Sequence, residues 1–77
     1  MIRELVIFVV QQLVLYPQDV IVTFTEKEDI DLLEIRVASE DRGRVIGKEG
    51  HTIKSIRALI DAAMPNHKKK IMLELSR

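Results

Sequence analysis

Two glycines three positions apart, Gly47 and Gly50, mark the stretch of the sequence that is best suited to chemistry. Glycine adopts positive φ angles at little cost and has no Cβ, so a ligand backbone can lie directly against the main chain there. A helix is expected to start just after Gly50, and the unpaired N–H groups and positive dipole end of a helix start attract phosphate. We therefore expect phosphates to be held by the backbone N–H groups of Lys48, Glu49 and Gly50 and by the Lys48 ammonium group.

Basic and apolar side chains surround this turn in a way that suits a single nucleic-acid strand. The basic residues would flank the phosphates, and Ile46 and Ile53 would form an apolar floor for the bases. The residues expected to form the binding site are Arg44, Ile46, Gly47, Lys48, Glu49, Gly50, His51, Ile53, Lys54, Arg57, Lys68, Lys69 and Lys70. The roles of His51 and of the lysine run each have two possible interpretations. His51 is either an extra phosphate donor or simply an exposed residue at the helix start, and the lysine run is either a phosphate contact or a solvated turn.

The residues around the turn resemble the signature of the KH domain, a module that binds RNA or single-stranded DNA through a GxxG loop. The resemblance is carried by the stretch V-I-G-K-E-G-x-x-I-x-x-I, from Val45 to Ile56. It implies that the loop clamps about four backbone nucleotides. Members of the family often have a neutral or basic residue where this chain has Glu49. Its carboxylate is expected to weaken phosphate binding, unless it points away or reads a base edge. An ordinary helix corner, with Gly47 as the C-terminal cap, would leave Gly50 and the surrounding basic residues unexplained.

The charges of the chain are distributed unevenly, although the formal net charge is zero. Residues 1–41 hold three basic and nine acidic residues, a balance of −6, whereas residues 42–77 hold nine basic and three acidic residues, a balance of +6. Such asymmetry indicates that the second half faces a polyanion. The zero total predicts weak long-range attraction.

The length of 77 residues predicts one small domain, 1–77, with a modest core. The chain has no cysteine, which excludes disulfides and thiolate metal sites and is consistent with a reducing cytosol, so a cytoplasmic protein is expected. The apolar segment 5–16 is too short to span a membrane. It does not resemble a secretory signal either, because Glu4 offsets Arg3 and no small-residue cleavage site follows.

The apolar segment 5–16 is instead expected to form a helix that ends at Tyr16, because Pro17 disfavours the α conformation in the residue before it. The residues predicted to face the core are Ile2, Leu5, Val6, Val9, Leu13 and Tyr16. The residues predicted to form an apolar flank are Ile7, Val10 and Val14. This flank is either the side of a wide core stripe or a surface that a partner chain covers.

Three strands are expected at residues 20–25, 32–38 and 71–76, where β-branched and other apolar residues alternate with polar ones. The first two are joined by the acidic segment 26–31, which we predict to be a solvated hairpin tip. A metal site there is disfavoured, because the spacing and turn glycine of a calcium-binding loop are missing.

Two helices are expected between the second and third strands. Ser39 is the predicted N-cap of a short helix that ends near Ile46, and a longer helix follows the GxxG loop and ends near Met64, before Pro65. The residues of the longer helix predicted to face the sheet are Ile53, Ile56, Leu59, Ile60 and Ala63. The binding groove is expected between the short helix and loop on one side and an edge strand with residues 65–70 on the other.

The predicted order is α-β-β-α-α-β, an α+β fold in which a three-stranded mixed sheet carries three helices packed on one face. The first two strands form an antiparallel hairpin, and a right-handed crossover makes the second and third strands parallel. This order is similar to that of the type II (prokaryotic) KH fold, and the whole chain resembles the small stand-alone KH proteins of bacteria. The resemblance implies binding of single-stranded RNA or DNA in post-transcriptional regulation or RNA chaperoning. It also implies a homodimer, or a heterodimer with a second KH-bearing protein.

Other functions find little support in the sequence. The stretch from Gly43 to Lys48 has three residues between its glycines, not the four of a nucleotide-binding P-loop, and Glu49 stands where Ser or Thr is needed. The two histidines, His51 and His67, have no ligand spacing around them that suits a metal. We therefore expect no enzyme, no metal and no cofactor. The main alternative to RNA binding is a dimerisation or adaptor module that acts through the apolar first helix.

Overall fold

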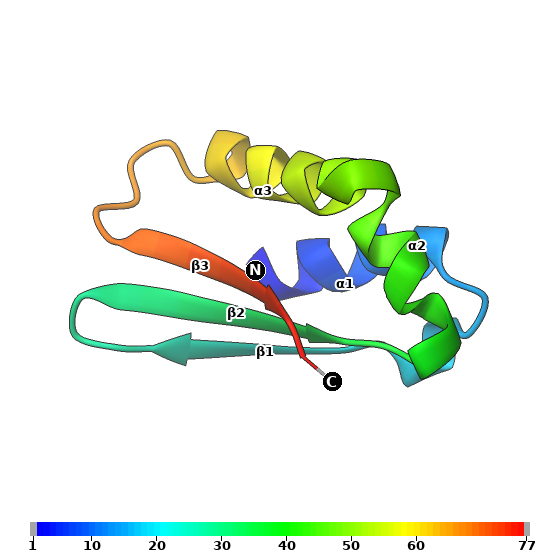
Figure 1. Ribbon diagram of the computed structural model, residues 1–77. Helices are drawn as coiled ribbons and strands as arrows, with labels where there is room; N and C mark the ends of the chain where they lie inside the picture. Colours follow the sequence, from blue (N-terminus) through cyan, green and yellow to red (C-terminus); the bar gives the residue numbers. More distant parts are fainter. Residues whose placement is uncertain (1, 77) are drawn as a thin grey trace.

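The computed structural model describes residues 2–76 and confirms the predicted order α-β-β-α-α-β (Figure 1). The helices are α1 (Ile2–Leu13), α2 (Arg42–Ile46) and α3 (His51–Ala63), and the strands are β1 (Ile21–Glu26), β2 (Ile30–Arg36) and β3 (Lys70–Leu75). Short 3-10 turns lie at η1 (Pro17–Asp19), η2 (Ser39–Asp41) and η3 (Lys48–Gly50). Within the described residues, no helix is both long enough and apolar enough to cross a membrane.

The strands form one mixed sheet in the order β1-β2-β3. β2 pairs antiparallel with β1 through the hairpin and parallel with β3, so Leu33 lies opposite Phe24 on one side and Leu73 on the other. The helices lie together on one side of this sheet, and the other face carries none (Figure 1). The predicted topology is therefore confirmed, and β3 is left as the edge strand beside α3.

The core lies between the sheet and the helices. The residues that make it up are Val6, Val10, Val22, Leu33, Ile35, Val37, Val45, Ile56, Ile60 and Ile71, all buried. Alternate residues of β2 point inward, as a strand with one covered face requires. α3 contributes Ile56 and Ile60, which are four positions apart and so share one side of the helix.

The first helix ends earlier than predicted, at Leu13 instead of Tyr16. The backbone N–H groups of Leu15 and Tyr16 donate to the two carboxylate oxygens of Asp41, at 2.9 and 3.0 Å, so the chain leaves the helix to reach them. Asp41 is fully buried, and these bonds satisfy its carboxylate. A contact 25 residues away along the chain, and not Pro17 alone, decides where this helix ends.

The apolar stripe of α1 is also turned relative to the prediction. Val10, expected on the flank, is completely buried, whereas Leu13 and Tyr16, expected in the core, are 38% and 39% exposed. The helix presents its Val6–Val10 side to the core, since these two residues are one turn apart. On α3, likewise, Leu59 and Ala63 are exposed although both were expected to face the sheet.

Two further local predictions were wrong. Ser39 does not cap α2, because its hydroxyl donates to the Glu40 carboxylate at 3.1 Å and the helix is preceded by the 3-10 turn η2. Asp31 does not belong to a solvated hairpin tip, because β2 already begins at Ile30. That start places Asp31 at an inward-facing position with 1% of its surface exposed.

Candidate nucleic-acid interface

The turn between α2 and α3 depends on a backbone conformation that only glycine adopts readily. Gly47 has φ 76° and ψ 171°, and a Cβ there would lie 2.2 Å from Oγ1 of Thr52. Its N–H donates to the Gly43 carbonyl oxygen at 2.8 Å and closes the end of α2. The bare main chain at Gly47 is therefore required both by the backbone angles and by the Thr52 side chain packed against it.

The next two residues of the turn to leave the right-handed region, Glu49 and Gly50, adopt left-handed backbone conformations just before α3. Glu49 has φ 57° and ψ 25°, and Gly50 has φ 76° and ψ 13°. The Gly50 N–H donates to the Gly47 carbonyl oxygen at 3.1 Å. The Gly50 amide is therefore already used inside the turn, contrary to the prediction that it would face a phosphate.

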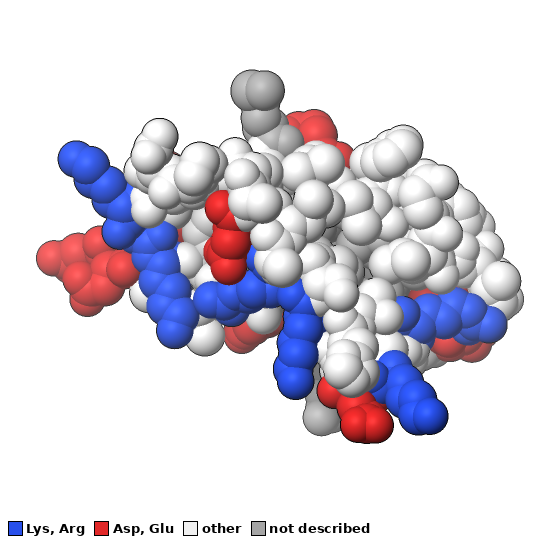
Figure 2. Space-filling view, turned by 90° about the horizontal axis from the view of Figure 1, so that it is seen from above, with Lys and Arg blue, Asp and Glu red and all other residues white. Residues whose placement is uncertain are grey.

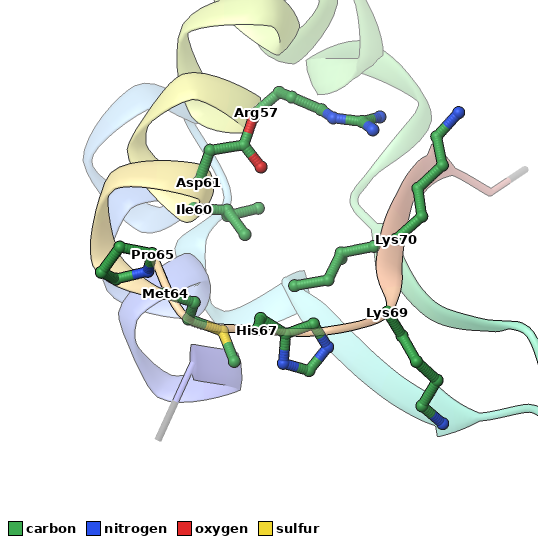
Figure 3. A pocket seen from close by; sticks show the side chains of 9 residues that line it. Arg57, Ile60, Asp61, Met64, Pro65, His67, Lys69 and Lys70 are labelled. Carbon is green, nitrogen blue, oxygen red and sulfur yellow. The ribbon is translucent and has the colours of Figure 1, made fainter.

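A groove runs between α3 and the edge strand β3. It consists of two adjoining hollows of about 220 and 240 Å³ that share Arg57. The first hollow, nearer the turn, is lined by Ile53, Lys54, Arg57 and Leu73. The second is lined by Arg57, Ile60, Asp61, Met64, Pro65, His67, Lys69, Lys70 and Ile71 (Figure 3). The far wall of this groove is the irregular segment 65–69 that joins α3 to β3.

Most of the Lys and Arg side chains visible in the view onto α3 lie along one long margin of the molecule, with Asp and Glu side chains among them, whereas the opposite margin is mostly uncharged (Figure 2). Of the predicted site residues, the structure brings Ile53, Lys54 and Arg57 into the groove. Lys69 and Lys70 lie at its far end. Sequence reasoning missed Asp61, which lines the second hollow and adds a negative charge to it.

The remaining predicted residues line neither hollow, so the near wall of the groove is α3 and not the short helix and loop, as was predicted. Ile46, at the end of α2, is 38% exposed, and Lys48, Glu49 and His51 are exposed around the turn. Arg44 is exposed, and its guanidinium donates to the Glu40 carbonyl oxygen at 3.1 Å and lies 3.6 Å from the Asp41 carboxylate. Lys68 is exposed and lines neither hollow.

The segment 65–69 is tied to the β1–β2 hairpin by three side chains, Asp31, His67 and Lys69, which we call the clasp. Nε2 of His67 lies 2.7 Å from Oδ2 of Asp31, and Nζ of Lys69 lies 3.0 Å from Oδ1. Nζ of Lys69 also donates a hydrogen bond to the Lys27 carbonyl oxygen at 2.8 Å. Its contact with Oδ1 of Asp31 is an ion pair that lacks hydrogen-bond geometry.

These contacts affect the titration of the Asp31 carboxyl. The Lys69 ammonium lowers the pKa of Asp31 below its ordinary value; burial opposes this effect, and the contact with His67 reinforces it. The clasp was not predicted, because Asp31 was assigned to the hairpin tip. The alternation of Asp31, Leu33 and Ile35 along β2 was the signal that could have placed this aspartate inside.

Comparison with known proteins assigns the family. Residues 3–75 match the family model described as KhpA/KhpB, KH domain. This chain belongs to the KhpA/KhpB KH-domain family. The match spans both the GxxG loop and the groove of this KH domain, as well as the clasp residues.

Similar bacterial proteins agree with this assignment. Proteins named RNA-binding protein KhpA from Listeria monocytogenes and Clostridium perfringens are 41% and 40% identical over 73 residues, which is 95% of this chain and 96% and 97% of theirs. A protein of the same name from Thermotoga maritima is 39% identical over 67 residues, 87% of this chain and 89% of its own. No solved structure gives a significant match.

Proposed function

We propose that this KH domain is an RNA-binding protein that holds a short single strand between α3 and β3, with the GxxG loop against the phosphate backbone. The observation that carries the proposal is the bare, positive-φ turn at Gly47, which leads into α3, the helix whose Lys54 and Arg57 line the groove. The names of the related proteins support RNA as the ligand. Single-stranded DNA offers the same phosphate spacing and is a second ligand to test.

In this proposal the basic side chains bind phosphates and the apolar side chains contact bases. Lys48, Lys54 and Arg57 contact phosphates, while Ile53 and Leu73 present an apolar surface to the bases. The chain has one Tyr and two Phe, and none of them lines the groove. Aromatic stacking supplies a large share of single-strand affinity in other proteins, so a single copy of this domain is expected to bind modestly and with little base preference.

A modest, sequence-tolerant grip suits a cytoplasmic protein that acts in post-transcriptional regulation or as an RNA chaperone, since both tasks require release as well as binding. Specific readout would need more base-edge contacts than Ile53 and Leu73 can make. We expect selectivity to come from a partner or from several copies acting on one RNA.

The test is a titration of a fluorescent single-stranded RNA pool with the wild type and the double variant Lys48→Asp/Glu49→Asp at two salt concentrations. With two to four phosphate contacts, the log–log salt slope is roughly −1.5 to −3, at about 0.7 per contact on a single strand. The variant should lose binding while circular dichroism shows that it remains folded. Arg36→Asp, at the exposed end of β2 and outside both hollows, matches the change of net charge away from the groove and should bind as the wild type does.

Two results would contradict the proposal. Undiminished binding by the folded loop variant would move the site away from the GxxG loop, toward the lysines of residues 68–70. An equal loss in the loop variant and in Arg36→Asp would show that only net charge matters and that no groove is involved.

A dimerisation or adaptor role is a second candidate, and exposed apolar side chains on one surface favour it. Phe8 on α1 and Leu15 just after it are each 62% exposed, and a hollow of about 520 Å³ opens between Ile2, Leu5, Ala63 and Met64. A second copy of the chain, or a second KH protein of the KhpB kind, could cover this surface.

Sedimentation of the wild type and of Phe8→Lys tests this candidate. If α1 forms the interface, the variant sediments as a monomer and stays folded, whereas Leu32→Lys on the uncovered sheet face leaves the association unchanged. Val10→Lys is unsuitable because Val10 is completely buried and a lysine there would unfold the domain. A wild type that is monomeric at high concentration and does not bind a second KH protein would exclude this role.

A further inference from the structure

We infer that Asp31 is a positioning residue of the RNA groove: through the clasp with His67 and Lys69, it fixes the segment 65–69 in the place where that segment can form the far wall. This inference rests on the proposed function, since it concerns the same groove. It assigns a role in RNA binding to a carboxylate on the β1–β2 hairpin, which contributes no lining residue to either hollow of the groove.

The far wall has no regular structure to hold it in place. α3 ends at Ala63 and β3 begins at Lys70. Between them the Met64 N–H donates back to the Ile60 carbonyl oxygen of α3 at 3.1 Å, and the His67 N–H donates to the Met64 carbonyl oxygen at 3.2 Å. Segments with few buried contacts open at low free energy unless side chains fix them. The clasp supplies such contacts, because two of its three members, His67 and Lys69, belong to this segment.

Asp31 is suited to this role by its burial. A carboxylate with 1% of its surface exposed is stable there only when nearby cations or donors offset its burial. In the described structure the His67 ring meets Oδ2 at 2.7 Å, and the Lys69 ammonium pairs with Oδ1 at 3.0 Å without a hydrogen bond. The same attraction acts on the partners, so the buried Asp31 carboxylate holds the His67 and Lys69 side chains of the wall in position. The Lys27 carbonyl oxygen adds a second hairpin contact to Lys69.

The same geometry separates Lys69 from its neighbours in the lysine run. Figure 3 shows Lys70 extending on the side of Arg57, whereas Lys69 extends the opposite way, toward the hairpin strands. The Lys69 ammonium is already paired with Asp31 and the Lys27 carbonyl oxygen. Lys69 thus shapes the groove with its aliphatic stem and does not neutralise a phosphate, while Lys70 is free to do so.

Substitution of Asp31 discriminates between a positioning role and a plain electrostatic one, because the two predict opposite signs. Asp31→Asn removes a negative charge and releases Lys69, so general electrostatics predicts tighter RNA binding. If Asp31 positions the wall, the folded variant instead binds RNA roughly three- to tenfold more weakly, an effect of the size seen when members of one network are uncoupled. Asp29→Asn, at the exposed hairpin tip, removes the same charge outside the clasp and should bind as well as the wild type or better.

The experiment is a double-mutant cycle with Asp31→Asn and Lys69→Gln, read by titration of a fluorescent single-stranded RNA at two salt concentrations. Positioning predicts that each single variant and the double variant lose about the same affinity, and that Lys69→Gln leaves the salt slope unchanged. Lys70→Gln should reduce the slope by about 0.7, as expected for one phosphate contact. Additive losses in the cycle, or a lower slope in Lys69→Gln, would show that Lys69 contacts phosphate directly and would overturn the inference.

Amide hydrogen exchange without RNA keeps the test independent of the proposed function. The clasp predicts faster exchange in residues 65–69 of Asp31→Asn, with the α3 and β2 core unchanged; unchanged exchange in that segment would overturn it. If Asp31→Asn does not fold, His67→Gln and Lys69→Gln test the same contacts from the other side. If the wild type binds no RNA but Asp31→Asn still exchanges faster in residues 65–69, the proposed function is rejected and the clasp is retained as the contact that holds this segment.

Discussion

The two ends of the groove are held in place in different ways. At the GxxG end the shape is set by backbone angles: Gly47 and Gly50 take positive φ values, and hydrogen bonds between near neighbours close the turn. At the far end an irregular segment is held by side chains that are distant in sequence, with Asp31 36 residues away from His67. The first end should therefore be sensitive to an added Cβ, and the second to loss of charge and to pH.

The largest effect is expected from Gly47→Ala. Its φ and ψ angles lie in a region that is essentially restricted to glycine, and the new Cβ would lie 2.2 Å from Thr52 Oγ1. We expect a loss of about 2–5 kcal/mol in the free energy of unfolding, from backbone strain and overpacking together. Urea denaturation followed by circular dichroism measures it.

Gly50→Ala and Gly43→Ala serve as matched comparisons. At Gly50 the Cβ would meet only the end of the Lys54 side chain, at 4.0 Å, so the loss should be about 1–2 kcal/mol from the left-handed conformation alone. At Gly43, inside α2, a Cβ has no neighbour within 4 Å, so alanine should stabilise by about 0.5–1 kcal/mol. Equal losses at Gly47 and Gly50 would show that the Thr52 contact does not constrain the turn.

A smaller stabilising effect, which is lost at acid pH, is expected at the clasp. The Lys69 ammonium, with burial opposing and His67 reinforcing it, lowers the pKa of Asp31 below 3.8 in the folded state. Because the folded-state pKa is the lower one, the stabilisation is present above pH 3.8 and is lost as the pH falls through the folded value. The difference in Tm between the wild type and Asp31→Asn should therefore shrink as the pH falls below 3.8.

The Lys69→Gln variant sharpens this measurement. Without the ammonium that lowers it, the pKa of Asp31 should rise, and the difference in Tm between Lys69→Gln and the double variant with Asp31→Asn should begin to shrink at a higher pH. An NMR titration of the Asp31 carboxyl carbon measures the same change directly. If the two profiles coincide, Lys69 does not set the ionisation of this carboxylate.

The difference between the two ends also explains what the sequence could predict. The strand order, the hairpin, the parallel crossover and the GxxG turn were all predicted, because they depend on alternation along strands and on glycine types that act within a few residues. The groove between α3 and β3 follows from that topology. Arg57 shares its side of α3 with Ile53 and Lys54 because it follows them by four and three residues.

The errors concern residues whose partners are far away in sequence. Asp41 accepts hydrogen bonds from Leu15 and Tyr16 and so ends α1 before the turn residues would. Asp31 was placed at a solvated tip because acidic residues are usually exposed, whereas its position in β2 and its pairing with His67 and Lys69 keep it buried. Residue types alone do not reveal such pairs, since any of several carboxylates could have met either cation.

The smallest effect is expected at the GxxG end, where removal of a negative charge should change RNA affinity in the direction opposite to that predicted for the clasp. Glu49 is exposed and already has φ 57°, so Glu49→Lys adds no new backbone strain and should leave stability unchanged. It removes a carboxylate from the phosphate path and adds a cation, so RNA should bind a few-fold more tightly and the salt slope should steepen by about 0.7. We therefore expect removal of a negative charge to tighten binding at the loop and to weaken it at Asp31, since the proposed site has the first carboxylate facing the strand and the second holding the wall. If affinity and slope are both unchanged in Glu49→Lys, this side chain points away from the RNA, and the loop binds through its backbone and Lys48 alone.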